Sequence, residues 1–264
     1  MLGDDVVKHP HAVRSSIGLA GQFAAVEPAM TGRENIEMIA RLFGQSRSSA
    51  RLNADRVLAQ LGLADDGNRL VRTYSGGMRR KLDLGASLVG APRLLLLDEP
   101  TTGLDPRSRI DLWDAIRHLV AHGTNVVLTT QYLDEADHLA DDIVVIDGGR
   151  TIAHGTPAEV KRQTGRNVIE VHVRDAAHVA EVARALSAFG AGEARVDDAT
   201  RRVTVLVEGG AEQLTPALKP IEDRGIVLDD VALRPPRLDE AFLTLTGHAM
   251  QADPRQNAKQ LRVL

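Results

Sequence analysis

The sequence contains no cysteine, few aromatic residues and no long hydrophobic run. Among its 264 residues there is no Cys, and Phe, Trp and Tyr together make up 3%. The absence of thiols excludes disulfides and thiolate metal sites, and it is typical of a protein from a reducing compartment. No apolar stretch approaches the roughly 20 residues that span a bilayer, and the first residues lack the apolar core of a secretory signal. We therefore expect a cytosolic protein whose membrane role depends on a partner.

A strong excess of charge of either sign is also missing. The formal net charge is -4, from 32 basic and 36 acidic side chains. Proteins that bind nucleic acid usually carry a broad basic surface, so this composition argues against a nucleic-acid partner. Arg79, Arg80 and Lys81 form the one tight basic cluster. Most such clusters are solvated helix faces, and this one also lies close enough to a predicted anion site to contact a phosphate.

That anion site is predicted at residues 75–77. Ser75 is a good helix N-cap residue, and Gly76 and Gly77 follow it at the start of a helical pattern. Glycines leave the first amide groups of the helix unshielded. Unshielded amides at the positive end of the helix dipole favour an anion such as phosphate.

A predicted buried strand follows and ends in two acids. Residues 94–97 are all leucine, as expected for a strand covered on both faces, and Asp98 and Glu99 come directly after them. Open α/β sheets place their ligands at the carboxyl ends of the strands, so both carboxylates are predicted at a ligand site. Asp105, followed by Pro106, is the predicted N-cap of the next helix.

The spacing in that next helix predicts one buried face. The predicted stripe consists of Ile110, Trp113, Ile116 and Val120. Trp113, the only Trp in the chain, is interpreted as a core residue rather than part of a binding surface.

The three motifs SGG, LLLLDEP and GLD, in this order and spacing, resemble the signature, Walker B and D-loop series of ABC transporter ATPases. The resemblance implies an α/β fold of the P-loop NTPase type, with a parallel sheet and a helical subdomain at about residues 30–90. It also implies ATP and Mg²⁺ as cofactors, held between two ATPase subunits of a homodimer. In this interpretation Asp98 holds the metal, and Glu99 orients or deprotonates the attacking water. The residues implied to bind nucleotide in this region are Ser75, Gly76, Gly77, Met78 and Asp105.

Two glutamines extend the resemblance. Gly21-Gln22 is similar to the Q-loop, which implies that Gln22 binds near the nucleotide and links its metal and water site to a membrane-embedded permease subunit. A surface amide in a turn is the alternative. Gln131 stands where most members have a switch His, and its neutral amide can donate a hydrogen bond but carries no positive charge. The string TTQYLDEAD resembles the ATP-binding subunits of antibiotic exporters of the daunorubicin/doxorubicin resistance type.

The family's phosphate-binding loop, G-x-x-x-x-G-K-[ST], is missing, since no Lys in the chain follows a Gly. That loop cradles the phosphates of the nucleotide. One interpretation is a truncated or misassigned reading frame, which is favoured because everything downstream is intact. The other is a natural variant that cannot hold a nucleotide by itself. In both cases we expect weak ATP binding, unpaired strand edges and bare apolar faces, because a βα unit from the interior of the sheet is lacking.

The pattern changes after an ATPase domain predicted at residues 1–164. Residues 165–247 read strand, helix, strand, strand, helix, strand and a closing helix, which predicts a small ferredoxin-like α+β accessory domain. It contains no catalytic constellation. Residues 248–264 are polar and are predicted to be disordered.

The sequence favours an ATPase subunit that powers a multidrug or antibiotic exporter, peripheral on the inner face of the cell membrane through its permease. A catalytically silent subunit, acting as a partner of a complete ATPase and a permease, is the alternative. A soluble ABC protein acting on ribosomes or DNA is disfavoured by the acidic balance and by the exporter-type C-terminal unit.

Overall fold

The computed structural model describes residues 2–22, 25–163, 166–246 and 261–263. The chain divides into two compact units, Met1–Thr151 with Ala258–Leu264, and Ile152–Asn257. This division falls before the predicted boundary at residue 164. The reason is that α7 (Pro157–Arg162) packs against α10 (Leu238–Thr246), which belongs to the second unit.

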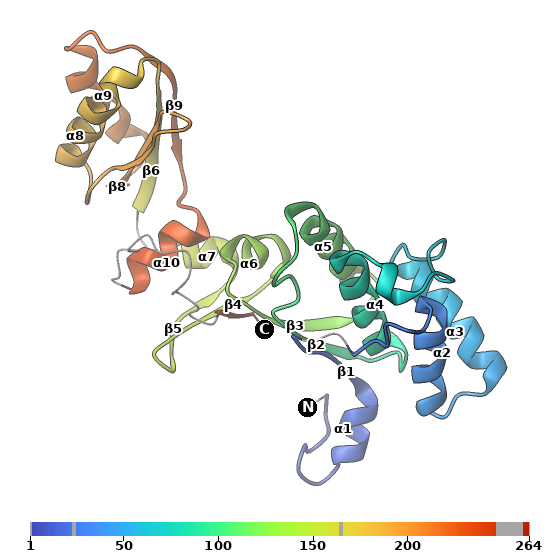
Figure 1. Ribbon diagram of the computed structural model, residues 1–264. Helices are drawn as coiled ribbons and strands as arrows, with labels where there is room; N and C mark the ends of the chain where they lie inside the picture. Colours follow the sequence, from blue (N-terminus) through green and yellow to red (C-terminus); the bar gives the residue numbers. More distant parts are fainter. Residues whose placement is uncertain (1, 23–24, 164–165, 247–260, 264) are drawn as a thin grey trace. The chain divides into compact units, whose positions relative to one another are not determined.

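A six-stranded sheet has the strand order β1-β2-β3-β10-β4-β5, and β1 to β4 and β10 belong to the first unit (Figure 1). Strands β1, β2 and β3 are mutually parallel, and the register places Leu19 beside Leu96 and Leu96 beside Val127. Their parallel carboxyl ends therefore meet at one edge of the sheet, as predicted for a ligand site. The strands are β1 (Ile17–Ala20), β2 (Leu94–Asp98), β3 (Asn125–Thr130), β4 (Ile143–Asp147), β5 (Arg150–Gly155) and β10 (Leu261–Val263).

Strand β10 comes from the C-terminal end of the chain and lies in the interior of this sheet. It pairs antiparallel with residues 128–130 of β3 on one side and with residues 143–145 of β4 on the other. Residues 261–263 are thus a strand and not part of a disordered tail, because they supply hydrogen-bonding partners to two strand edges. The rest of the predicted tail, residues 248–260 and 264, lies outside the described residues.

One face of the sheet is less well covered than the other. Leu95 and Leu97 of β2 are buried, whereas Leu19 on β1 is 66% exposed. The helices α4 and α6 contact β1 and β3, respectively. Leu19 is therefore an exposed apolar side chain on the face of the sheet opposite Leu95 and Leu97.

Local capping sets where the helices of this unit begin. Thr31 and Glu34 form a capping box, in which each side chain bonds the other residue's backbone N–H. Ser46, Ser75 and Asp105 cap the following helices through their side-chain oxygens. The helices are α1 (Pro10–Ser16), α2 (Gly32–Leu42), α3 (Arg47–Gln60), α4 (Gly76–Leu88), α5 (Pro106–Ala121) and α6 (Leu133–Leu139).

Helices α2 and α3 pack against each other and against α4, forming the predicted helical subdomain (Figure 1). Helix α5 packs against α4 and α6. Trp113 and Ile116 of α5 are buried as predicted, but Ile110 and Val120 are 53% and 42% exposed. The buried face of α5 is rotated toward Leu112 and Leu119, so the prediction was wrong for two of the four stripe residues.

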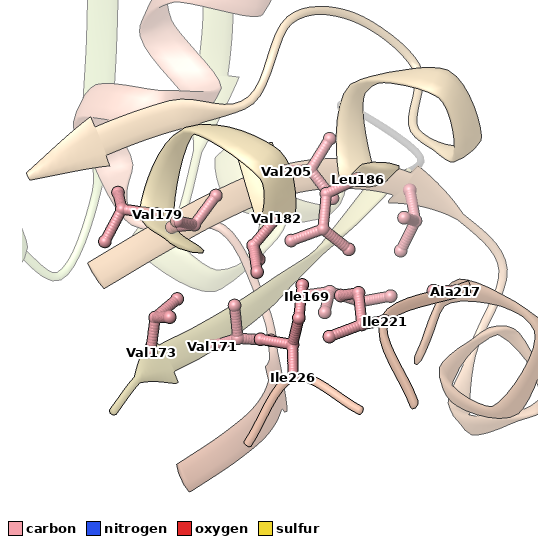
Figure 2. Packing of buried hydrophobic residues seen from close by; sticks show 12 residues of the cluster. Ile169, Val171, Val173, Val179, Val182, Leu186, Val205, Ala217, Ile221 and Ile226 are labelled. Atoms are coloured by element: carbon pink, nitrogen blue, oxygen red, sulfur yellow. The ribbon is translucent and has the colours of Figure 1, made fainter. Parts of the chain in front are cut away.

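The second unit contains an antiparallel sheet with the order β7-β8-β6-β9. Two helices pack with it around an aliphatic core that includes Ile169, Leu186 and Ile221 (Figure 2). Its elements follow the predicted order, strand, helix, strand, strand, helix, strand and a closing helix. They are β6 (Arg166–Val173), α8 (Val179–Phe189), β7 (Arg195–Asp197), β8 (Arg202–Glu208), α9 (Leu214–Glu222), β9 (Leu228–Arg234) and α10.

A partly buried ionic cluster holds helix α10 against this sheet. Arg234 at the end of β9 donates to both carboxylate oxygens of Glu240, at 2.8 and 2.9 Å, and to Glu170 on β6 at 3.0 Å. Bidentate hydrogen bonds of this kind fix orientation as well as distance.

Across the part of the chain that the structure describes, no helix has the length and apolar character needed to cross a membrane.

Candidate functional site

The two acids at the end of β2 are oriented by the neighbouring strand β3. Thr129 on β3 donates its hydroxyl to Asp98 Oδ1 at 2.5 Å. The backbone N–H of Glu99 donates to the carbonyl oxygen of the same Thr129 at 3.0 Å. One residue of β3 therefore holds both the exposed Asp98 carboxylate and the backbone that carries the Glu99 carboxylate.

The structure brings the side chains of Glu99 and Gln131 together. Gln131 Nε2 donates to Glu99 Oε2 at 3.3 Å, and Thr102 donates its hydroxyl to the same oxygen at 3.1 Å. Glu99 adopts a φ of 44°, in the left-handed region that residues other than glycine rarely occupy. Such strain persists only where the surroundings hold it, and it is common at functional sites.

The turn at residues 75–77 forms the predicted helix start. Ser75 Oγ accepts a hydrogen bond from the backbone N–H of Met78 at 3.1 Å, and both Ser75 and Gly76 are exposed. Gly77 is buried against the first turn of α5, where an added Cβ would lie 2.6 Å from Ser108 Oγ. Only glycine fits there, so the amides of α4 stay unshielded and the turn lies directly beside the start of α5.

Asp105 is the N-cap of α5, as predicted. Its carboxylate accepts hydrogen bonds from the Ser108 hydroxyl at 2.6 Å and from the Ser108 backbone N–H at 3.0 Å. These bonds lower the pKa of Asp105 below the ordinary value of 3.8, so the side chain is a stable anion at neutral pH.

Arg80 contradicts the interpretation of the basic cluster as a solvated face or phosphate contact. Its guanidinium donates to the carbonyl oxygens of Gly21 at 2.6 Å and Pro100 at 2.7 Å. It also forms an ion pair with Asp83 at 3.3 Å. Sequence reasoning did not find this role, because the acceptors are backbone groups that lie 59 and 20 residues away in the chain. The exposed Gln22 follows Gly21 directly and thus lies next to this contact.

Burial dominates the titration of the Arg80 and Asp83 pair. It raises the pKa of Asp83, and the backbone N–H of Ala25 and the Arg80 charge only partly offset this. Burial likewise lowers the pKa of Arg80. A pair that remains charged against this penalty depends on close geometry and on further hydrogen bonds, which the carbonyl oxygens and the Ala25 N–H provide.

A second buried acid lies behind the site. Glu135 on α6 is fully buried, and its Oε1 accepts a hydrogen bond from Trp113 Nε1 at 3.0 Å. Burial raises the pKa of Glu135 above the ordinary value of 4.5. Among the described residues, the buried side-chain atoms without a hydrogen-bond partner are Glu135 Oε2, Thr101 Oγ1 and Arg109 Nε. The bond to Trp113 explains why this Trp is in the core and fixes α6, which follows Gln131, against α5.

The carboxylates at the end of β2 fit Mg²⁺, and the start of α4 fits a phosphate. Magnesium prefers hard oxygen ligands, keeps several waters and commonly uses one or two carboxylates, which suits the exposed Asp98 beside Glu99. The exposed residues Ser75 and Gly76 at the start of α4 suit a phosphate. The chain has no glycine-rich loop ending in Gly-Lys to enclose the other side of such a ligand.

Comparisons with known proteins agree with this geometry. A family model described as ABC transporter matches residues 2–102. The chain is 49% identical over 246 residues to the daunorubicin resistance ATP-binding protein DrrA2 of Streptomyces coeruleorubidus, covering 93% of this chain and 76% of the relative. The chain belongs to the ABC transporter family. This confirms the resemblance drawn from residues 74–105.

A second relative supports the same membership, and a solved structure shows the same fold. The daunorubicin/doxorubicin resistance ATP-binding protein DrrA of Streptomyces peucetius is 47% identical, covering 94% of this chain and 75% of that protein. A structure of an ATP binding subunit of an ABC transporter has a TM-score of 0.52 at 24% identity, covering 62% of this chain and 69% of the other. This likeness confirms the predicted α/β fold with its parallel sheet and helical subdomain.

Proposed function

We propose that this chain is the ATP-binding and hydrolysing subunit that powers a multidrug or antibiotic exporter. The observation that carries the proposal is the contact between Gln131 and Glu99 at the ends of β3 and β2, beside Asp98. The proposal is also supported by the printed names of relatives that are 41–49% identical over most of the chain.

The proposed roles follow from the positions of the side chains. Asp98 holds Mg²⁺, directly or through a water, and Thr129 fixes its rotamer. Glu99 orients or deprotonates the attacking water, and Gln131 orients water or phosphate through its amide N–H. When bound, ATP supplies the phosphoryl group, and catalysis is mostly positioning and electrostatic stabilisation. The residues proposed to contact nucleotide are Gln22, Ser75, Gly76, Gly77, Met78 and Asp105.

We propose two kinds of protein partner. A second ATPase subunit, in a homodimer, faces residues 75–77 and Asp105 across the nucleotide. An integral-membrane permease contacts the helical subdomain and keeps the chain at the inner face of the membrane. The permease contact is supported by exposed apolar side chains of the helical subdomain. Leu42 at the end of α2 is 80% exposed, Phe43 directly after it is 56% exposed, and Leu52 on α3 is 71% exposed.

We further propose that the chain as given binds ATP poorly. Backbone amides and a lysine normally supply much of the phosphate binding in this class of site, and the sequence lacks that loop. The alternative, a catalytically silent subunit that serves a complete ATPase and a permease, is favoured by the same feature. In the silent subunit, the turn at residues 75–77, with Ser75 and Gly76 exposed, would face the partner's ATP.

Drug uptake into inverted membrane vesicles tests the proposal. Vesicles carrying this chain and its permease are given Mg-ATP and daunorubicin, and accumulation of the drug is followed by its fluorescence. We expect Glu99→Gln to reduce ATP-driven uptake at least a hundredfold, because a neutral amide cannot accept the proton from water. Glu222→Gln, an exposed carboxylate on α9 of the second unit, is the matched control.

The two hypotheses predict different outcomes of this assay. Uptake that requires the chain but is unchanged by Glu99→Gln would reject the hydrolytic role and support the silent subunit. Uptake that is unaffected by omission of the chain would reject both.

A further inference from the structure

All the hydrogen-bonding capacity of Arg80 is used inside the protein. Nε donates to Pro100 O, Nη1 donates to Gly21 O and Asp83 Oδ2, and Nη2 donates to Asp98 O at 3.2 Å and Glu99 O at 3.4 Å. A guanidinium has five N–H donors, and these are five acceptors. Arg80 therefore has no donor left for a phosphate, although it lies in the second turn of the helix that begins at Ser75.

The acceptors show what Arg80 holds in place. Three consecutive carbonyl oxygens, those of Asp98, Glu99 and Pro100, point toward one guanidinium. In the middle of this turn Glu99 has a φ of 44°. A left-handed conformation at a residue with a side chain is unfavourable by itself, and it persists where neighbouring bonds require it. The guanidinium satisfies the carbonyl groups that this conformation turns inward.

The same side chain reaches a second functional segment. It donates to Gly21 O immediately before Gln22, and its ion-pair partner Asp83 accepts the backbone N–H of Ala25 at 2.7 Å. The side chains of Arg80 and Asp83 are only 11% and 4% exposed. The pair thus contacts the chain on both sides of Gln22 as well as the turn that carries Glu99.

We propose that Arg80 is a positioning residue that holds Glu99 in its left-handed conformation and couples that turn to the segment around Gln22. The inference rests on the proposed function of Glu99 and Gln22, but its structural content is independent of any nucleotide. Because one guanidinium bonds both segments, a displacement of the segment around Gln22 also alters the hydrogen bonds that hold the Glu99 turn. Lysine, with a single ammonium on a flexible stem, cannot span these acceptors.

Amide hydrogen exchange of the purified full chain tests the coupling without ATP. We expect Arg80→Gln to speed exchange about tenfold in peptides covering residues 96–102 and also in peptides covering residues 18–22, since charge-assisted hydrogen bonds to both are lost. Arg80→Lys should restore protection in part. Arg79→Gln, the exposed neighbour on the same helix, should leave both segments unchanged. If Arg80→Gln and Arg80→Lys speed amide exchange only in peptides from α4, and in neither residues 96–102 nor residues 18–22, the proposal is overturned.

A thermodynamic cycle at Glu99 separates positioning from general support of the fold. Glycine adopts a left-handed conformation without strain. In the wild-type background we expect Arg80→Lys to change the exchange rate of residues 96–102 several-fold. In a Glu99→Gly background we therefore expect the same substitution to change that rate less than twofold. An equal effect in both backgrounds would show that Arg80 does not hold the Glu99 conformation. Because no readout involves hydrolysis, a failure here is distinct from a failure of the vesicle assay.

Discussion

At the scale of single residues, the acids of the first unit differ in their titration because their surroundings differ. Asp105 is exposed and accepts two hydrogen bonds from Ser108, which lower its pKa. Burial raises the pKa of Asp83 and of Glu135. Burial thus disfavours the ionised form of these two acids, whereas hydrogen bonds favour it in Asp105.

The raised pKa of Glu135 predicts how stability depends on pH. The unfolded chain ionises this group near its ordinary value of 4.5, and the folded chain at a higher pH. The associated stability is therefore fully present below about pH 4.5 and is lost as the pH rises through the folded pKa. We expect Glu135→Gln, which keeps an acceptor for Trp113, to remove this loss and to be at least as stable as wild type at pH 8. Urea unfolding of both proteins at pH values from about 4.5 to 8 measures the free energy of unfolding that this prediction concerns.

Two controls accompany this measurement. Glu135→Ala should cost about 2 kcal/mol or more at every pH, because it leaves a cavity and an unpaired Trp113 N–H. A slope from Asp83 should remain in Glu135→Gln, since burial also raises the pKa of that acid. If the Gln variant keeps the full wild-type slope, Glu135 does not have the assigned titration.

At the scale of elements, helix starts were predictable from sequence, whereas long-range contacts were not. Ser75 and Asp105 cap α4 and α5 as expected, because capping depends on residues three positions apart. The partners of Arg80 and Glu135 lie on other elements, and no local pattern signals them. The stripe predicted for α5 was half right, since the helical period defines a face but the neighbours α4 and α6 decide its rotation.

The capping box of α2 gives a direct prediction. Thr31→Ala removes the side-chain acceptor for the backbone N–H of Glu34. It should lower the free energy of unfolding by about 1 kcal/mol, the usual cost of losing an N-cap. Arg51→Ala, at an exposed position of α3, is the control and should stay within about 0.5 kcal/mol of wild type. Equal urea midpoints for wild type and Thr31→Ala would show that the box does not stabilise α2.

Strand β10 gives a prediction about solubility. Arg262 lies between β3 and β4, paired with Thr129 and Val144. Proline at residue 262 has no N–H and does not fit the interior of a sheet. We expect Arg262→Pro to open the edges of β3 and β4 and to cause self-association, seen as a larger hydrodynamic radius in light scattering. A variant as monodisperse as wild type would show that β10 is dispensable for the sheet.

At the scale of the whole molecule, the sequence specified the family and the class of fold, and the structure added the arrangement of the site. The motif order at residues 74–105 predicted the parallel sheet and the acids at its edge. The missing phosphate-binding loop was also visible in the sequence. The sequence did not predict that the C-terminal strand β10 enters the interior of the sheet, because three residues of a polar tail carry too weak a pattern to predict a strand.

We propose that this chain carries the acidic half of a nucleotide site, Asp98 and Glu99, without a loop that cradles the phosphates. Isothermal titration of the purified chain with Mg-ATP tests it most directly. We predict no saturable binding in the micromolar range. Saturable micromolar binding that is lost in Asp98→Asn would contradict the account.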